Sequence, residues 1–369
     1  MTLITTNRDA ILRPLQAVTG IVERRHTLPI LSNVLLERKR GLLTLMATDL
    51  EMQVTTSSDC PAYGEDTAVT VSARKLQDIL RSLPEACEVS LEVSDSRLHV
   101  KAGRSRFNLQ TLPAPDFPRM AEGADGGARF SLRQSVFRQL LALVQYAMAQ
   151  QDIRYYLNGL LMIVDAGTLT VVATDGHRLA LASLKIDEDM SRRQEVILPR
   201  KAVVELVKLL TDSDELVQVN VLGNQVRFAF GAILLVTKVV DGKFPDYKRV
   251  IPFGHGKQFQ IDREVLLQAL QRAAILSNEK FRGVRWVLTE NSLRIACTNT
   301  EQEEAQEELE IDYKGEPLDI GFNVTYLTDV LSNLSVQSVD CALGDANSSA
   351  LITVPGNEGF SYVVMPMRI

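Results

Sequence analysis

The sequence predicts an α+β protein built from three tandem copies of one domain, each combining antiparallel sheets with a pair of helices. The repeat rests on three segments in which an apolar strand ends in Thr-Asp or Thr-Asn. These segments are LLTLMATDLEMQVTT (42–56), GTLTVVATDGHRLAL (167–181) and NSLRIACTNTEQEEA (291–305). Their aligned threonines, Thr48, Thr174 and Thr298, are 126 and 124 residues apart. This nearly constant spacing predicts copies of about 120 residues each.

Each of these strands is preceded and followed by a candidate helix. The upstream segments are 7–22, 133–148 and 262–276, and the downstream segments are 69–83, 196–210 and 320–334. Ser72, Asp262 and Asn323 are of the residue types that cap helix N-termini. The strands between the helices alternate or are apolar throughout, and short connections favour antiparallel pairing. We therefore expect the two helices of each copy to share one face of their sheets.

Proline and glycine concentrate at two places, residues 113–128 and 251–257. Such clusters mark linkers between domains. We expect domains at 1–127, 128–254 and 255–369.

The composition is that of a soluble globular protein, with 46% hydrophobic and 23% charged residues. No apolar run reaches the roughly eighteen residues of a membrane span, and the charged N-terminal segment lacks the apolar centre of a secretory signal. A cytoplasmic location without membrane contact is the expectation. The four cysteines contain no CxxC pair, and His26, His99 and His255 are scattered. We therefore expect no metal, no disulfide framework and no cofactor.

Charge is segregated by element, although the whole chain has a formal charge of −6. The predicted helices carry eleven basic and six acidic side chains, counted as solvent-facing and including Arg8 and Glu205. One explanation of this excess is that helices favour Lys and Arg for their helix propensity alone. The alternative is a basic helical face that contacts the phosphates of a nucleic acid, without reading its sequence because no dense Arg, Asn and Gln array is present.

A second asymmetry separates the first copy from the third. Strand SRLHVKAGRSRFNLQ of the first copy is basic, whereas TEQEEAQEELEI of the third is acidic. Both are candidate sheet edges, and an unpaired edge needs a partner. Opposite charges at opposite ends favour head-to-tail association into a ring. Two chains would supply six domains, with helices inside and sheets outside, around a hole of roughly 30–35 Å. A DNA duplex fits such a hole.

Several long motifs carry a family resemblance over the whole chain. They are RYYLNG (154–159), ATDGHRLA (173–180), FPDYKRV (244–250), AAILSNEKFRGVR (273–285), NTEQEEA (299–305), GFNVTY (321–326) and YVVMPMRI (362–369). With them the sequence resembles the bacterial DNA polymerase III beta subunit, the sliding-clamp family. The resemblance implies a non-catalytic processivity factor for DNA replication that forms a head-to-tail homodimeric ring around double-stranded DNA.

The resemblance also implies partners. A clamp loader driven by ATP would open the ring, and the replicative polymerase, translesion polymerases, mismatch-repair proteins and ligase would bind it through short peptides. The peptide groove would lie between the second and third domains. Its implied residues are Leu157, Thr174, Gly176, His177, Arg178, Leu179, Pro245, Val250, Tyr326, Asn347, Ser349, Val363, Val364, Met365, Pro366, Met367 and Arg368. Asn347 departs from the apolar residue expected at its position.

Two further sets of residues follow from the resemblance alone. The implied dimer interface comprises Arg97, Arg104, Arg106, Phe107, Leu109, Ile275, Leu276, Glu301, Glu303, Glu304 and Glu307. The implied DNA contacts are Arg25, Arg74, Gln151, Tyr155, Tyr156, Arg200 and Lys201.

Two other functions compete with this interpretation. Thr174, Asp175 and His177 could form the acid–base set of a metal-dependent nuclease, but the other copies keep the threonine and lose the imidazole. That pattern favours a strand-end turn in which the acidic side chain bonds local backbone. The second competitor is a monomeric scaffold that binds DNA nonspecifically by its surface. The sequence contains no GxxxxGK[ST] motif, so we expect no nucleotide hydrolysis.

Overall fold

The computed structural model describes residues 1–23, 28–59, 66–121, 127–187, 193–278 and 280–368. The chain forms two compact units, Met1–Phe137 with Val204–Val239, and Arg138–Val203 with Val240–Ile369. The central copy therefore contributes half of its strands to each unit. The predicted boundaries after residues 127 and 254 both fall between regular elements.

A twelve-stranded sheet forms the first unit, in the order β1-β6-β7-β8-β5-β2-β3-β4-β16-β15-β14-β9. Its strands are β1 (Thr2–Asn7), β2 (Asn33–Lys39), β3 (Leu42–Thr48), β4 (Met52–Asp59), β5 (Thr67–Ser72), β6 (Glu88–Ser94), β7 (Arg97–Ala102), β8 (Ser105–Leu112), β9 (Arg129–Arg133), β14 (Leu216–Leu222), β15 (Gln225–Phe230) and β16 (Ile233–Lys238). The sheet passes from the first copy into the central copy where Ile233 of β16 pairs with Thr56 of β4.

The second unit holds an eight-stranded sheet, β13-β10-β11-β12-β24-β23-β22-β17, and a four-stranded sheet, β20-β19-β18-β21. Its strands are β10 (Gly159–Asp165), β11 (Thr168–Thr174), β12 (Arg178–Lys185), β13 (Gln194–Pro199), β17 (Lys257–Asp262), β18 (Gly283–Thr289), β19 (Ser292–Thr298), β20 (Glu304–Glu310), β21 (Leu318–Asn323), β22 (Ser338–Leu343), β23 (Ala350–Val354) and β24 (Asn357–Val364). Every ladder between described strands of both units is antiparallel, as predicted; β12 and β24 join the central copy to the third.

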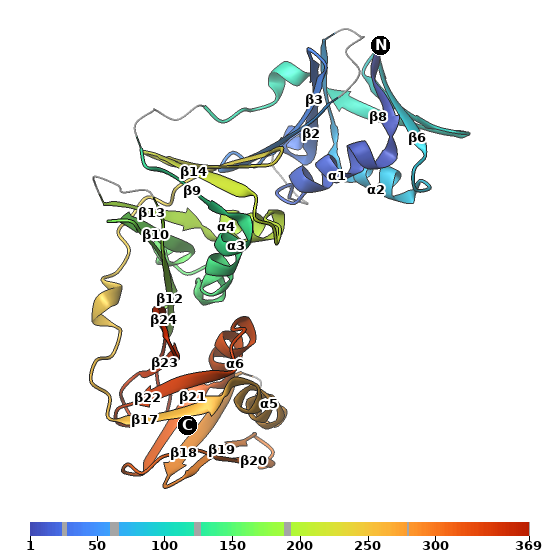
Figure 1. The fold of residues 1–369 in the computed structure, drawn as a ribbon. Helices are drawn as coiled ribbons and strands as arrows, with labels where there is room; N and C mark the ends of the chain where they lie inside the picture. The colour runs from blue at the N-terminus through green and yellow to red at the C-terminus, as the bar shows by residue number, and fades with distance from the viewer. Residues whose placement is uncertain (24–27, 60–65, 122–126, 188–192, 279, 369) are drawn as a thin grey trace. The chain divides into compact units, whose positions relative to one another are not determined.

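The helices fall within the predicted segments. They are α1 (Arg8–Thr19), α2 (Ala73–Ser82), α3 (Gln134–Ala142), α4 (Arg200–Leu209), α5 (Arg263–Ala274) and α6 (Val324–Asn333). In the first copy α1 packs on α2 and on β3 and β4, and in the third copy α5 packs on α6 and on β17, β19 and β20 (Figure 1). The expectation that paired helices share one face of their sheets is confirmed in these two copies.

Two of the three predicted N-caps are confirmed. The Asp262 carboxylate accepts from the backbone N–H groups of Glu264 and Val265 at 2.9 and 3.0 Å, and Asn323 accepts from Thr325 at 2.9 Å. The prediction for Ser72 is wrong, because its side chain makes no cap hydrogen bond. Like Asp262 and Asn323, Ser72 ends a paired strand, but its hydroxyl oxygen is one bond closer to the backbone than their side-chain oxygens and reaches less far toward the helix N–H groups.

The Thr-Asp segments form the same turn in the first and central copies. Thr48 donates to the Met52 carbonyl at 2.9 Å, and Thr174 donates to the Arg178 carbonyl at 2.6 Å. Asp175 Oδ1 accepts from the N–H groups of His177 and Arg178 at 2.9 and 3.0 Å. Asp49 Oδ1 accepts in the same way from the N–H groups of Glu51 and Met52. The turn explains why the acid recurs without the histidine.

Two helix charges counted as solvent-facing are buried, so that part of the prediction is wrong. Arg8 is 9% exposed and donates to the Leu83 carbonyl at 2.6 Å. Glu205 is 5% exposed and accepts from Lys208 at 3.3 Å. Arg8 begins α1 and binds the chain just after α2, so its charge satisfies a carbonyl beyond a helix end. Leaving these two residues out of the count does not change the excess of basic over acidic side chains on the helices.

The sheet edge predicted at the acidic strand is confirmed, and the edge predicted at the basic segment is confirmed only for part of β8, since β7 is paired on both sides. Strand β20 is the outermost strand of its sheet. Strand β8 pairs with β7 along its length but with β5 only at Thr111 and Leu112, so Ser105–Gln110 have a ladder partner on one side within the described chain.

Candidate functional site

A cavity of about 210 Å³ lies beside the Thr174 turn in the second unit. Its lining comes from four segments of the chain: Arg154, Leu157, Thr174, Gly176, His177, Arg178, Leu179, Pro245, Tyr247, Val250, Val363 and Met365. We call this cavity the groove.

The groove forms where the central copy meets the third. Leu179 of β12 pairs with Val363 of β24, and the Met365 N–H donates to the His177 carbonyl at 2.8 Å. These contacts set the last strand of the chain against the Thr-Asp turn. Residues nearly 190 positions apart in the chain therefore share one wall.

The groove has an apolar floor and a more accessible rim. Leu157, Leu179 and Val363 are at most 2% exposed and belong to one buried cluster. Val250 and Met365 are 41% and 44% exposed. Exposed methionine and valine beside a fixed apolar floor suit an adaptable contact with a ligand side chain.

Gly176 is required by the shape of the turn. Its φ is +90°, and a Cβ atom there would approach the Arg154 Nη1 atom to 2.9 Å. The Arg154 guanidinium is itself held by two hydrogen bonds to Asp152, at 3.0 and 2.8 Å, and by one to the Asp175 carbonyl at 3.2 Å. A side chain at position 176 could enter only by displacing this braced arginine.

The Asp152 carboxylate that braces Arg154 stays ionised over a wide pH range. Hydrogen bonds from the Arg154 side chain and backbone lower the pKa of Asp152 to about 2. Its charge therefore persists at all pH values well above 2. The ion pair of Asp152 with Arg154 is therefore not a pH switch near neutrality.

The structure brings ten of the predicted groove residues together in the lining. The other seven, Tyr326, Asn347, Ser349, Val364, Pro366, Met367 and Arg368, are not among its lining residues. Tyr326 stacks on the far side of Arg178, whose guanidinium carbon is 4.5 Å from the ring centre. Val364 is fully buried opposite Arg178 in the ladder. Asn347 belongs to a turn in which Asp345 accepts from the Asn347 N–H at 2.9 Å, and Ser349 follows this turn.

Two lining residues were missed by the sequence reasoning. Arg154 and Tyr247 both lie inside motifs that signalled the family, RYYLNG and FPDYKRV. Their roles depend on side-chain direction, which the motif alone does not give.

The predicted DNA contacts are spread over both units. Arg25 lies outside the described residues. Arg74 and Arg200 donate to backbone carbonyls, Val22 at 2.9 Å and Met148 at 3.0 Å, so part of each guanidinium is engaged by the protein. Lys201 is half-buried on α4. On the loop before β10, Gln151 has a φ of +57° and Tyr155 is 57% exposed, with its ring edge-on to Tyr156.

The predicted dimer contacts lie on or beside the two open edges. Arg97, Arg104 and Arg106 are exposed, and Phe107 and Leu109 are half-buried on β8. Ile275, just after α5, is 78% exposed, and Leu276 is half-buried. Glu301, Glu303 and Glu304 are exposed at the start of β20, whereas Glu307 already accepts two hydrogen bonds from Arg272, at 2.8 and 2.6 Å.

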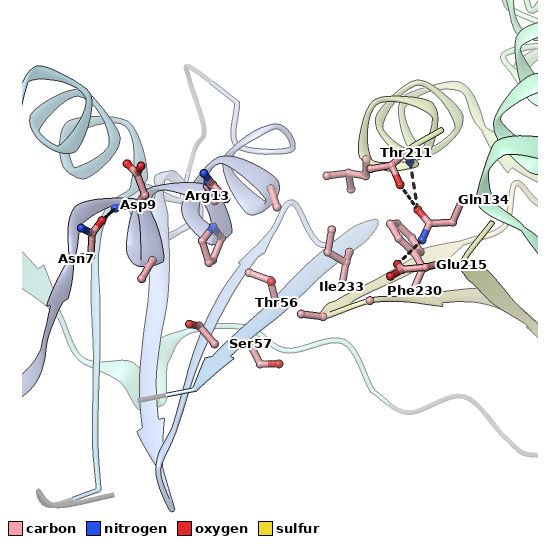
Figure 2. A pocket seen from close by; sticks show the side chains of 17 residues that line it. Asn7, Asp9, Arg13, Thr56, Ser57, Gln134, Thr211, Glu215, Phe230 and Ile233 are labelled. Atoms are coloured by element: carbon pink, nitrogen blue, oxygen red, sulfur yellow. Dashed lines mark hydrogen bonds between the residues drawn. The ribbon is translucent and has the colours of Figure 1, made fainter. Parts of the chain in front are cut away.

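A larger cavity of about 750 Å³ lies in the first unit between α1 and the turn joining β15 to β16. Figure 2 shows Arg13 and Asp9 on one side, with Gln134 bonded to Thr211 and Glu215 on the other. Its walls mix small apolar residues with charges of both signs, and none of the predicted site residues is part of its lining.

Within the described residues, no group of three or more His, Cys, Asp or Glu side chains is arranged to hold a metal ion. No helix in the same part of the chain is both long and apolar enough to cross a membrane.

Three family models match consecutive parts of the chain. They describe the N-terminal, central and C-terminal domains of the DNA polymerase III beta subunit, over residues 2–121, 131–246 and 248–368. The chain belongs to the DNA polymerase III beta subunit family. It is therefore a sliding clamp with three tandem clamp domains, an accessory processivity factor and not a catalyst.

Individual members of the beta subunit family cover the chain almost completely. The beta sliding clamp of Pseudomonas putida is 49% identical over 99% of both chains. A crystal structure of the DNA polymerase III subunit beta from Pseudomonas aeruginosa superposes with a TM-score of 0.96, at 48% identity and full coverage of both chains. Another structure of the Pseudomonas aeruginosa clamp is bound to griselimycin, with a TM-score of 0.95, 49% identity and 99% coverage of both chains.

Proposed function

We propose that this clamp receives short peptides of client proteins in the groove beside Thr174. The observation that supports this proposal most is the groove itself, with its buried apolar floor, exposed Val250 and Met365, and Arg154 hydrogen-bonded to Asp152 in its wall. A cavity of about 210 Å³ accommodates a few side chains and not a whole domain. Short linear segments are the partners that suit such a site.

Griselimycin, the compound bound to the Pseudomonas aeruginosa relative, serves as the probe for this proposal. Calorimetric titration should give one site per chain. Val250→Glu should weaken binding about thirtyfold or more, because it places a charge against the apolar groove. Leu216→Glu is the matched control, since Leu216 is 56% exposed on β14 and is not a lining residue. Equal binding by wild type and Val250→Glu would place the ligand elsewhere.

We further propose that two chains close head to tail into a ring, with β8 of one chain beside β20 of the other. Each strand has an open edge in the described chain. The basic residues Arg97, Arg104 and Arg106 lie on or near β8, and the acidic residues Glu301, Glu303 and Glu304 lie at or near the start of β20. Pairing such edges satisfies their backbone groups and their charges together.

Dimer stability should fall as salt rises, because part of this proposed interface is ionic. The measurement is the dimer dissociation constant by analytical ultracentrifugation at about 0.05 and 0.5 M salt. We expect a weakening of about tenfold across this range. A constant that does not change would show that the arginine and glutamate sets do not meet.

We propose that the ring encloses double-stranded DNA, with the basic helices toward the hole. Contacts from Gln151, Tyr155, Lys201 and the free parts of Arg74 and Arg200 would be sequence-independent. The same proposal includes opening of the ring by a clamp loader. It also includes binding of replicative and translesion polymerases, mismatch-repair proteins and ligase, in the cytoplasm. The domain boundaries after residues 127 and 254 are part of it too.

A further inference from the structure

A charged cluster lies behind the groove, on the seam between the central and third copies. Arg178 at the start of β12 supplies the cation, Asp175 of the turn supplies one carboxylate and Asp329 of α6 supplies the other. The Arg178 side chain is only 9% exposed. The cluster therefore joins a groove wall to a helix of the neighbouring copy.

Each nitrogen of the Arg178 guanidinium has a partner. Nε donates to Asp175 at 3.1 Å, Nη1 donates to Asp329 at 2.6 Å and Nη2 donates to the Tyr146 carbonyl at 2.6 Å. Two carboxylates face one cation, so its charge is already compensated within the protein. A client carboxylate would have to displace one of these partners to bind Arg178.

Aromatic rings enclose the same guanidinium. Its central carbon lies 4.5 Å from the Tyr326 ring centre and 5.6 Å from that of Tyr146. The Tyr146 hydroxyl is buried and has no hydrogen-bond partner among the described residues, so contacts of its ring with Arg178 and Tyr362 hold it in place. Tyr362 in turn donates to the Tyr326 carbonyl at 2.8 Å. The guanidinium of Arg178 thus contacts Tyr146 and Tyr326 directly, and Tyr362 of β24 packs against the first and bonds to the second.

We propose that Asp329 is a positioning residue for the groove, which acts on peptide affinity by holding Arg178. With Arg178 held, the adjoining Gly176–His177 turn and the Met365 segment bonded to it keep the geometry that accepts a peptide. This inference rests on the proposed function of the groove. It assigns Asp329 a role although Asp329 is not a lining residue.

The Arg178 side chain is 9% exposed and that of Asp329 is 34% exposed, so their ion pair is partly buried. Loss of the Asp329 charge leaves the buried guanidinium with one carboxylate, which disturbs it more than the loss of a partner from a surface pair would. The matched control is Asp319→Asn, since Asp319 of β21 in the same copy is bonded by both Nε and Nη2 of Arg285 but lies on the surface. Both variants lose one carboxylate charge, and only the first affects Arg178.

The test is calorimetric binding of griselimycin to five proteins: wild type, Asp329→Asn, Arg178→Met, the double variant of these two, and the control Asp319→Asn. We expect Asp329→Asn to weaken binding about tenfold, and Asp319→Asn to leave it within twofold of wild type. In the Arg178→Met background, Asp329→Asn should cause no further loss of griselimycin affinity, because Asp329 acts on the groove through Arg178. Additive losses would overturn the inference.

A conservative variant separates charge from shape. Asp329→Glu keeps the carboxylate on a chain one methylene longer and should bind within about threefold of wild type. A loss as large as that of Asp329→Asn overturns the inference. Emission of Trp286, buried in the third copy, reports whether each variant is folded. Failure of wild type to bind griselimycin would reject the proposed function, whereas wild-type binding with equal binding by Asp329→Asn would reject only the inference.

Discussion

Replacing Ile275 by glutamate is expected to convert the protein from a dimer to a monomer of 41.0 kDa. Ile275 follows α5, is 78% exposed and lies next to the half-buried Leu276. In the proposed ring it is covered by Phe107 and Leu109 of the other chain. Burying a carboxylate there should weaken the dimer about a hundredfold. Sedimentation velocity at micromolar concentration measures the change.

A control for this substitution lies at the opposite end of α5. Val265 is 48% exposed in the first turn of α5, and we expect Val265→Glu to remain dimeric. If Ile275→Glu stays fully dimeric, or if both variants dissociate equally, Ile275 is not a centre of the interface.

Replacing Gly176 by valine should both destabilise the protein and abolish binding in the groove. A β-branched residue is strained at a φ of +90°, and its Cβ would meet the Arg154 guanidinium. We expect a loss of about 2–4 kcal/mol in the free energy of unfolding of the second unit. Griselimycin affinity should fall more than a hundredfold, because Arg154 can retreat only by breaking its bonds to Asp152 and the Asp175 carbonyl.

Gly223→Val provides the comparison. Gly223 has a φ of +51°, and a Cβ there would have nothing within 4 Å. It therefore reports backbone strain without a steric conflict. We expect a smaller loss of stability and unchanged griselimycin binding. Equal effects of the two substitutions on binding would exclude the steric role of Gly176.

Much of the fold could be predicted because the repeat is visible in the residues. Thr48, Thr174 and Thr298 end β3, β11 and β19, and the helices fall within the segments that flank these strands. Local patterns also predict Asp262 and Asn323 as caps, since a cap depends on neighbours a few positions away. The charge difference between the two edge strands was equally visible, although nothing in one sequence shows which strand meets which.

Long-range side-chain contacts could not be predicted. Arg8 looks like any helix arginine, yet it is buried because the Leu83 carbonyl lies within its reach after folding. Arg178 and Asp329 are 151 positions apart, so no local pattern reveals their ion pair. The motifs located the groove, and the pairing of β12 with β24 was needed to show that Val363 lines it whereas Val364, paired with Arg178, does not.

The central claim is that the protein encircles DNA, and retention on a circle tests it most directly. The protein is loaded on nicked plasmid with a clamp loader and ATP, isolated by gel filtration and then treated with a restriction enzyme that cuts once. We expect retention on the intact circle and release after cutting, because a ring slides off an open end. Equal retention on both forms would mean that a surface contact holds the protein, as expected of a DNA-binding scaffold, and would contradict the ring.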